Sequence, residues 1–279
     1  SSVSRLFRRH PDIRWSRRYH AMVDDSVMDL LRRENRWRIL HCPEPALAHD
    51  GYRPELITSG DKAARLRQAM ESERRERPGD PYACAKLGGL ELSEGHHQRA
   101  VALLREGLSH CPPSDSATRY ELQLHLAMAL ARDPSPQEAI VLYRAALAQP
   151  LDPRLTLAAR LNLAALLLRS GEAQQSAELC RDVTSIVPEL ALGWYNLGLS
   201  QRQLGDLAGA IASYRQAILL APEAPEAHQN LAVAQLLAGD IGAARQGFRN
   251  AITLLERHGR QADAEDLRQR AGSMVRLED

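Results

Sequence analysis

The feature that most constrains this chain is a pattern that recurs every 34 residues. The segment that begins at Trp194 aligns with the segment that begins at His228. The matched pairs are Asn196/Asn230, Leu197/Leu231, Gly205/Gly239, Asp206/Asp240, Ala210/Ala244, Tyr214/Phe248 and Ala217/Ala251. One period earlier, these positions hold Asn162, Leu163, Gly171, Glu172, Ser176, Cys180 and Val183. A fixed period of this length indicates stacked copies of one small structural motif.

Two further repeats precede these three, each with a short insertion. Ala139, Tyr143 and Ala146 keep the small–aromatic–small spacing, and Leu87 and Gly88 match the Leu–Gly pair of the later repeats. We therefore expect five repeats over residues 81–258, with starts near residues 81, 120, 157, 191 and 225. The charged residues 259–279 are expected to form a C-terminal capping helix.

Each repeat is predicted to form two amphipathic helices, because its apolar residues fall at i, i+3, i+4 and i+7. Gly205 is expected to end the first helix in a left-handed conformation, and Asp206 to cap the second. Small residues such as Ala210 let the two helices approach closely, and Tyr214 fills the space between successive pairs. Because one helical hairpin cannot bury its apolar face alone, the repeats must stack into a superhelix. The predicted fold class is mainly α, an α-solenoid.

This pattern resembles the tetratricopeptide repeat (TPR) family. The residues at that family's spacing are Trp194, Leu197, Gly198, Ala210, Tyr214 and Pro222, with Gln201 in place of its usual aromatic. The resemblance covers about 200 residues. It implies a scaffold that binds a protein or peptide in a concave groove lined by the first helix of each repeat.

Candidate ligand-binding residues lie two positions beyond the Trp position of each repeat. In order along the chain they are Lys86, His125, Asn162, Asn196 and Asn230. An Asn side chain offers one acceptor and two donors, so three in register could pair with the backbone of an extended peptide. This resembles the asparagine ladder in the repeats of the O-linked N-acetylglucosamine transferase. The alternative is that Asn is simply common at this position.

Neighbouring side chains would complete the groove. Tyr195, Arg169 and Arg202 would add a mixed apolar and basic lining. A clamp for a chaperone's C-terminal carboxylate is not indicated, because Ala85 and Gly89 stand where such repeats place Lys and Asn.

Residues 1–58 lack the helical period. Stretches at 3–9, 13–23, 37–42 and 46–52 predict strands, and 27–35 predicts a helical turn or two. Four short strands without the βαβ order of elements bury too little apolar surface to form a stable domain on their own. We therefore expect a small α+β segment from the end of a larger α/β domain. Residues 59–80 are expected to form a linker helix that couples this segment to the first repeat.

Several motifs in this segment resemble the C-terminal part of the GT-A domain of family 2 glycosyltransferases. They are Arg5–Arg8, the segment ending at His20, Ala48–Tyr52, Lys62 and Arg65. The resemblance covers about 65 residues and points to a bacterial subgroup that continues into tetratricopeptide repeats. Ala21 stands where that family places the Glu of a His-Glu pair. The resemblance implies a parent enzyme that uses a divalent metal and a nucleotide-sugar, with His20 and His49 as candidate catalytic residues.

The chain itself is expected to be inactive and to hold no cofactor or metal. It contains no Asp-x-Asp metal motif, no Gly-rich phosphate loop and no HExxH motif. The sequence also begins at Ser1 rather than Met, which suggests a part cut from a longer chain. The favoured hypothesis is a protein-binding TPR scaffold that forms the C-terminal part of a bacterial family 2 glycosyltransferase. The alternative is a stand-alone TPR interaction scaffold without an enzymatic role.

The amino-acid composition excludes several classes of binding partner. The 36 Lys+Arg and 35 Asp+Glu residues leave a net charge of +1, which argues against general nucleic-acid binding. No apolar stretch approaches the ~18 residues that a membrane span needs. The four cysteines form no CxxC pair, which is typical of reduced thiols in a cytoplasmic protein. The bound partner, the sugar donor and acceptor, and the oligomeric state are not specified by the sequence.

Overall fold

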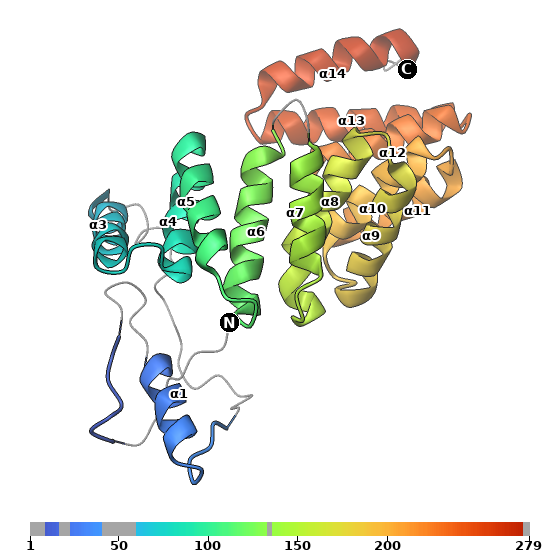
Figure 1. Cartoon of the computed structure of the whole chain (residues 1–279). Coiled ribbons are helices and arrows are strands. Elements are labelled where there is room, and N and C mark those ends of the chain that lie inside the picture. Colours follow the sequence, from blue (N-terminus) through green and yellow to red (C-terminus); the bar gives the residue numbers. More distant parts are fainter. Residues whose placement is uncertain (1–8, 17–22, 41–59, 133–135, 276–279) are drawn as a thin grey trace. The chain divides into compact units, whose positions relative to one another are not determined.

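The computed structural model describes residues 9–16, 23–40, 60–132 and 136–275. These residues form thirteen α-helices and one short 3-10 turn, and no strand is found among them (Figure 1). The mainly helical fold class is therefore confirmed. No helix in the described ranges is both long enough and apolar enough to cross a membrane.

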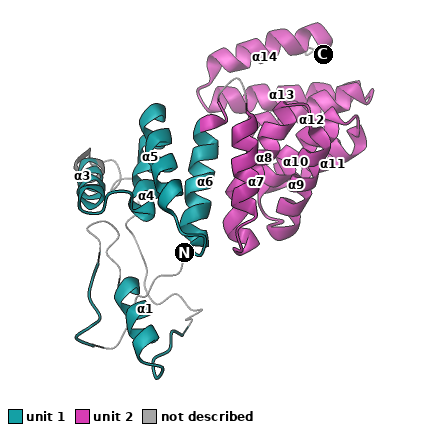
Figure 2. Cartoon of the chain, in the orientation of Figure 1, with its two compact units in different colours: residues 1–129 teal, residues 130–279 magenta. Residues whose placement is uncertain are grey.

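The chain divides into two compact units, residues 1–129 and 130–279 (Figure 2). The helices that lie in or reach the end of unit 1 are α1 (Asp24–Arg33), α3 (Gly60–Glu76), α4 (Pro81–Ser93), α5 (His97–His110) and α6 (Ser116–Leu130). The elements of unit 2 are α7 (Gln137–Leu147), η1 (Pro153–Thr156), α8 (Leu157–Arg169), α9 (Ala173–Ile186), α10 (Ala191–Gln203), α11 (Leu207–Leu220), α12 (Pro225–Leu237), α13 (Ile241–Arg257) and α14 (Gln261–Met274).

The turns inside the repeats follow the sequence pattern. Gly205 has a φ of 80°, and the side chain of Asp206 accepts a hydrogen bond from the Gly209 amide at 2.9 Å. One period later, Gly239 has a φ of 85° and Asp240 caps α13. A Cβ atom at Gly205 or Gly239 would meet nothing within 4 Å. The backbone conformation, rather than a lack of space, therefore requires glycine there.

The repeats pack through a large side chain on each second helix and a small residue on the first. Tyr214 of α11 is fully buried, and its ring fills the space where a Cβ atom on Gly198 would lie. In the preceding repeat the smaller Cys180 packs against Ala164. The following repeat pairs Phe248 with Ala232. The small residue is therefore glycine in the repeat that carries Tyr214 and alanine in the other two.

Apolar packing closes the C-terminal end of unit 2. The helix α14 lies against α13 (Figure 1). Its buried residues Ala264, Leu267 and Ala271 join the same cluster as Phe248 and Leu255 of α13. The polar residues of α14 remain exposed, which fits the expected capping helix.

A capping helix also covers the first hairpin of unit 1, where α3 packs against α4. Met70 of α3 is buried with Leu87 and Leu103, which come from α4 and α5. The structure thus gives residues 60–76 a packing role on the repeats, in addition to their place as the linker helix predicted from the sequence.

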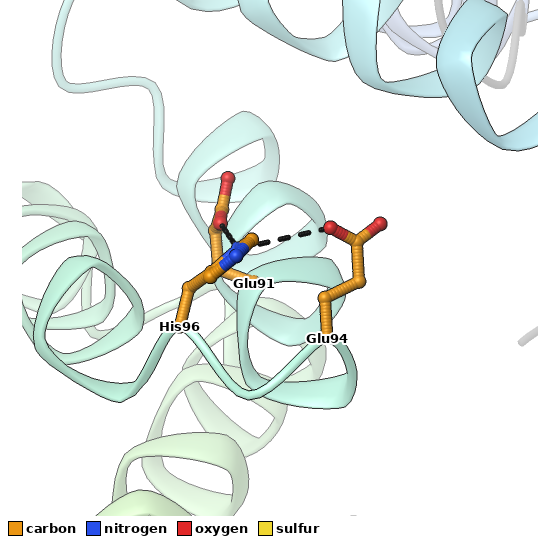
Figure 3. Close-up of side chains that lie close together, drawn as sticks. All are labelled: Glu91, Glu94 and His96. Atoms are coloured by element: carbon orange, nitrogen blue, oxygen red, sulfur yellow. Dashed lines mark hydrogen bonds and ion pairs between the residues drawn. The ribbon is translucent and has the colours of Figure 1, made fainter.

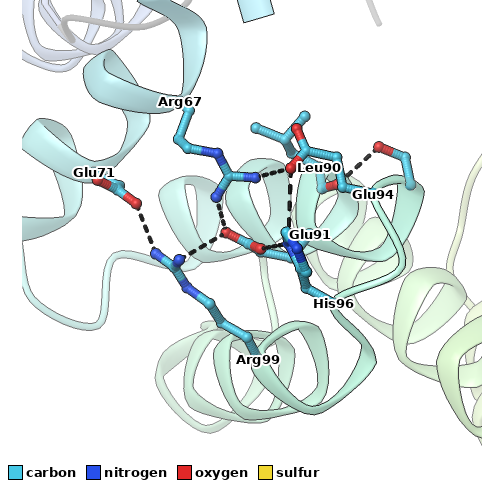
Figure 4. A network of polar contacts seen from close by, with 8 residues as sticks. Arg67, Glu71, Leu90, Glu91, Glu94, His96 and Arg99 are labelled. Atoms are coloured by element: carbon cyan, nitrogen blue, oxygen red, sulfur yellow. Dashed lines mark hydrogen bonds and ion pairs between the residues drawn. The ribbon is translucent and has the colours of Figure 1, made fainter. Parts of the chain in front are cut away.

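Charged residues fasten this cap around Glu91, which is fully buried near the end of α4. Figure 3 shows Glu91 beside Glu94 and His96, and Figure 4 shows arginines from two other helices converging on it. Arg67 of α3 binds both Glu91 and Glu94. Arg99 of α5 lies 3.3 Å from Glu91, and His96 Nδ1 lies 2.8 Å from it. Burial alone would raise the pKa of Glu91, but hydrogen bonds from Arg67 and His96 hold that pKa below its usual value.

The strands predicted in the N-terminal segment are wrong where the structure describes them. Neither the described part of the second stretch, 13–16, nor that of the third, 37–40, forms a strand. Ile39 is 59% exposed and Leu40 is 85% exposed, so the third stretch buries neither of these apolar side chains. A strand needs a neighbouring strand for its backbone hydrogen bonds, and the described residues supply none. The predicted helix is present as α1, three residues earlier than expected.

Changing Gly198 to alanine should destabilise the repeats. The added Cβ atom would lie 2.6 Å from the Tyr214 ring, which is fully buried. We expect a loss of about 1–3 kcal/mol, as in other overpacked cores. The matched control is Gly272→Ala in α14, where a Cβ atom would meet nothing within 4 Å. That variant should gain about 0.5–1 kcal/mol from helix propensity. Urea unfolding followed by circular dichroism measures both changes; equal effects would contradict the packing described here.

Changing Glu91 to glutamine should release α3 from the first hairpin. The change leaves Arg67 and Arg99 without their buried partner, at a cost of about 3 kcal/mol, the low end for a broken buried pair. Amide exchange in α3 should therefore speed up about 100-fold, as measured by mass spectrometry. The control is Glu94→Gln, which removes a more exposed partner of the same Arg67 and should cost less than about 1 kcal/mol.

The same experiment has a pH dependence. Since the pKa of Glu91 is lower in the folded protein than its usual 4.5, the stabilisation is present above that value and is lost as the pH falls through the folded pKa. Protection of α3 in the unchanged protein should fall with acid, and this fall should be smaller in Glu91→Gln. An identical acid response in both proteins would assign the effect to other groups.

Candidate functional site: one face of the first helices of unit 2

The candidate site is the surface of α8, α10 and α12 that carries the predicted ligand-binding residues. The helix α10 contacts both α8 and α12, so the three first helices lie side by side (Figure 1). Residues spaced by three, four or seven positions share one face of a helix. We call this surface the first-helix face, and its members used below are Asn162, Arg169, Leu192, Tyr195, Asn196, Leu199, Arg202, Asn230 and Leu237.

The three asparagines of the proposed ladder have different surroundings. Both N–H groups of the Asn230 amide are engaged, because Nδ2 donates to Tyr195 Oη at 3.0 Å and to the Glu226 carbonyl at 2.9 Å. Asn162 hydrogen-bonds the phenol of Tyr143. Within the described residues, the Asn196 side chain has no hydrogen-bond partner. It is therefore the member of the ladder that a ligand could engage without displacing a protein contact.

The two earlier positions of this series, in unit 1, are differently occupied. Lys86 Nζ lies 2.6 Å from Glu121, in an ion pair that joins α4 to α6. His125 is largely enclosed, and burial lowers its pKa, so the neutral imidazole is favoured. Neither side chain offers the amide chemistry of the three asparagines.

Tyr195 lies near the centre of the first-helix face. Its ring centroid is 6.1 Å from that of the buried Tyr214. Burial raises the pKa of Tyr195, with a further rise from Glu226 and an opposing effect of Arg202. Burial also raises the pKa of Tyr214 to about 12, against the lowering effect of Arg202. The guanidinium of Arg202 thus lies beside two neutral phenols.

The arginines predicted to line the groove lie near the ends of their helices. Arg169 is the last residue of α8, and its Nη2 donates to the Ala131 carbonyl at 3.2 Å. Arg202 is in the last turn of α10, is half-buried, and its Nε has no hydrogen-bond partner among the described residues. The structure therefore places Tyr195, Arg169 and Arg202 on neighbouring first helices, as the lining role requires.

Two exposed leucines on this face were missed at the level of sequence. Leu192 is 49% exposed and Leu237 is 60% exposed. Their counterparts 34 residues away are Ala158 and Glu226 for Leu192, and Gln203 for Leu237. The sequence contained a signal for both leucines. Each is an apolar residue at a repeat position that holds a small or polar residue in the neighbouring repeats.

The candidate catalytic residues of the N-terminal segment cannot be placed. His20 and His49 lie outside the described residues, as do Arg5, Arg8 and Ala21. Arg65 is described and is an exposed residue of α3.

A second cluster, Glu91, Glu94 and His96, has the residue types of a metal site. Their ligand atoms lie within 4.8 Å of one another (Figure 3). However, Arg67 binds both carboxylates and Arg99 approaches Glu91, so two cations already occupy the space around it. We therefore interpret this cluster as the fastening of α3 described above. The sequence signal was Glu91 itself, which stands four residues after Leu87, where the related repeats place Leu167 or Gln201.

Comparison with known proteins supports the repeat assignment. A family model described as TPR repeat matches residues 198–239. A TPR repeat-containing protein from Synechococcus elongatus is 38% identical over 252 residues, which cover 78% of this chain. The chain spans 62% of the length of that relative.

Solved structures share the fold at low sequence identity. The TPR protein YrrB is 15% identical with a TM-score of 0.57, over 72% of this chain and 99% of YrrB. MamA from Desulfovibrio magneticus RS-1 is 21% identical with a TM-score of 0.56, over 63% of this chain and 96% of that structure. The repeat pattern, the helix pairs and these similarities agree: the chain contains tetratricopeptide repeats.

Proposed function

We propose that this protein is a scaffold that binds an extended peptide or a peptide segment of a protein along the first-helix face. The observation that carries the proposal is the combination of chemistry on that face. It holds exposed apolar side chains at Leu192 and Leu237. Within the part of the chain that the structure describes, the amide of Asn196 has no hydrogen-bond partner, and Arg169 and Arg202 have no carboxylate partner. A peptide offers apolar side chains, backbone amides and carboxylates, which match these three kinds of group.

The asparagines would hold the ligand backbone. Asn196 can donate and accept without losing an internal contact, whereas Asn162 and Asn230 would first leave the phenols of Tyr143 and Tyr195. Tyr195 would then be free to contact the ligand as well. The proposed ligand-binding residues are Asn162, Asn196, Asn230, Tyr195, Arg169 and Arg202.

A structural neighbour is consistent with this use of the fold. YrrB is described as a TPR protein with an unusual peptide-binding site. At 15% identity the similarity extends to the fold alone. It supports the proposal only in the sense that a solenoid of this kind can hold a peptide.

The finer hypothesis is that this scaffold continues a family 2 glycosyltransferase. It rests on the motifs of residues 1–65, most of which lie outside the described residues. A coding sequence in frame ahead of Ser1, with an Asp-x-Asp motif after a predicted strand, would support a glycosyltransferase parent. An upstream sequence without that motif would leave the stand-alone scaffold as the better hypothesis.

Peptide selection tests the proposed function. A phage library of random 12-residue peptides is selected on the full chain, and the dissociation constant of the best peptide is measured by calorimetry. Asn196→Ala should weaken binding about tenfold, since one net hydrogen bond contributes about 1.4 kcal/mol. The triple change of Asn162, Asn196 and Asn230 to alanine should weaken it further.

The matched control is Asn250→Ala, an exposed asparagine on the second helix α13. Its variant should bind the peptide as well as the unchanged protein does. Failure to select any peptide, or equal losses in the Asn196 and Asn250 variants, would refute binding at the first-helix face. Unchanged affinity in the triple variant would refute the asparagine ladder.

A further inference from the structure

The charged side chains of α8 and α10 are all basic. Together these two first helices carry Arg160, Arg169 and Arg202 and no Asp or Glu. Arg160 is neutralised by Asp182 of α9 at 2.8 Å. In the described part of the chain, no carboxylate lies within ion-pair distance of Arg169 or Arg202. Among the described residues, this face therefore keeps two positive charges without a carboxylate partner.

Several arginines at the C-terminal end of unit 2, by contrast, form ion pairs with glutamates. Arg257 pairs with Glu223 at 3.2 Å, and Arg268 pairs with Glu256 at 2.6 Å. Arg260 pairs with Glu226 at 2.5 Å. Glu226 is the one carboxylate of α12. Its pairing with Arg260 means that it does not compete for the arginines of α8 and α10.

The position of Arg169 and Arg202, which lack a carboxylate partner among the described residues, favours a carboxylate ligand. Both stand in the last turns of neighbouring helices that contact each other. Arg202 is half-buried beside the phenol of Tyr214, and its Nε lacks an acceptor. A guanidinium that is partly withdrawn from water forms its strongest hydrogen bonds with a carboxylate, which it can bind through two N–H groups.

Apolar surface adjoins this charge. Leu199, one turn before Arg202 in α10, is half-buried, and Leu237 at the end of α12 is 60% exposed. A ligand that crosses from α8 to α12 therefore meets positive charge first and apolar surface afterwards.

We propose that the ligand of the first-helix face is an acidic extended peptide segment, whose carboxylates bind Arg169 and Arg202 and whose apolar side chains contact Leu237. This proposal rests on the proposed function and adds the chemical class of the ligand. It differs from a clamp for a terminal carboxylate at Ala85 and Gly89, because the cations lie at the ends of α8 and α10 and can bind carboxylates inside a chain.

The test uses the peptide selected on the full chain and a second form in which every Asp and Glu is replaced by Asn and Gln. Fluorescence anisotropy gives both dissociation constants at 50 and 300 mM NaCl. The acidic form should bind at least tenfold more tightly at low salt, and high salt should reduce that difference. This comparison needs no change in the protein, so a folding defect cannot obscure it.

Protein variants then locate the effect. The double variant Arg169→Gln, Arg202→Gln should bind the two peptide forms equally, while Arg202→Lys should keep part of the preference. The matched control is Arg215→Gln, an exposed arginine on the second helix α11 for which no ion pair is found among the described residues. It should retain the full preference, and circular dichroism confirms that each variant is folded.

The outcomes separate the two proposals. A selected peptide that depends on Asn196 but contains no Asp or Glu, or that binds equally in its amide form, would overturn the acidic ligand and leave peptide binding intact. Failure to select any peptide would overturn the proposed function itself. Binding of a 12-nucleotide oligothymidine that needs Arg169 and Arg202, without any peptide binding, would assign the arginines to nucleic acid and overturn both.

Discussion

Packing between a large residue on each second helix and a small residue on the preceding first helix holds the described repeats together. Tyr214 against Gly198, Cys180 against Ala164 and Phe248 against Ala232 are three forms of the same contact. This contact fixes how closely the two helices of a hairpin approach. It therefore also fixes which side chains of α8, α10 and α12 remain on the other side, where the first-helix face lies. The chemistry of the first-helix face is therefore set in part by the packing of the core.

The two capping helices solve the same problem with different chemistry. A solenoid needs terminal elements that are apolar toward the repeats and polar toward water. At the C-terminal end α14 does this with Leu267 and two buried alanines. At the first hairpin, α3 uses Met70 together with an ion-pair network on the buried Glu91. A buried carboxylate needs several donors to offset its lost hydration, and α3 and α5 each supply an arginine.

The structural features that recur in every repeat could be predicted from the sequence. Features that depend on one particular contact between distant residues could not. The period of 34 residues predicts the helix pairs, and the Gly205–Asp206 turn follows from local backbone chemistry alone. The strands expected at 13–23 and 37–42 required neighbouring strands, and none is found beside their described parts, 13–16 and 37–40. The network of Glu91 required Arg67, 24 residues earlier on another helix. Among the described residues, Asn196 has no side-chain partner and Arg202 has no carboxylate partner; this depends on where every nearby side chain lies, which periodicity does not specify.

The direct contact of α10 with both α8 and α12 sets the width of the first-helix face. Contacting helices have axes about 8–10 Å apart, so three in a row present a surface roughly 25–30 Å across. An extended chain advances about 3.3 Å per residue. For the proposed peptide ligand, this width corresponds to about eight or nine extended residues, and a shorter segment would leave one of the three first helices without contact.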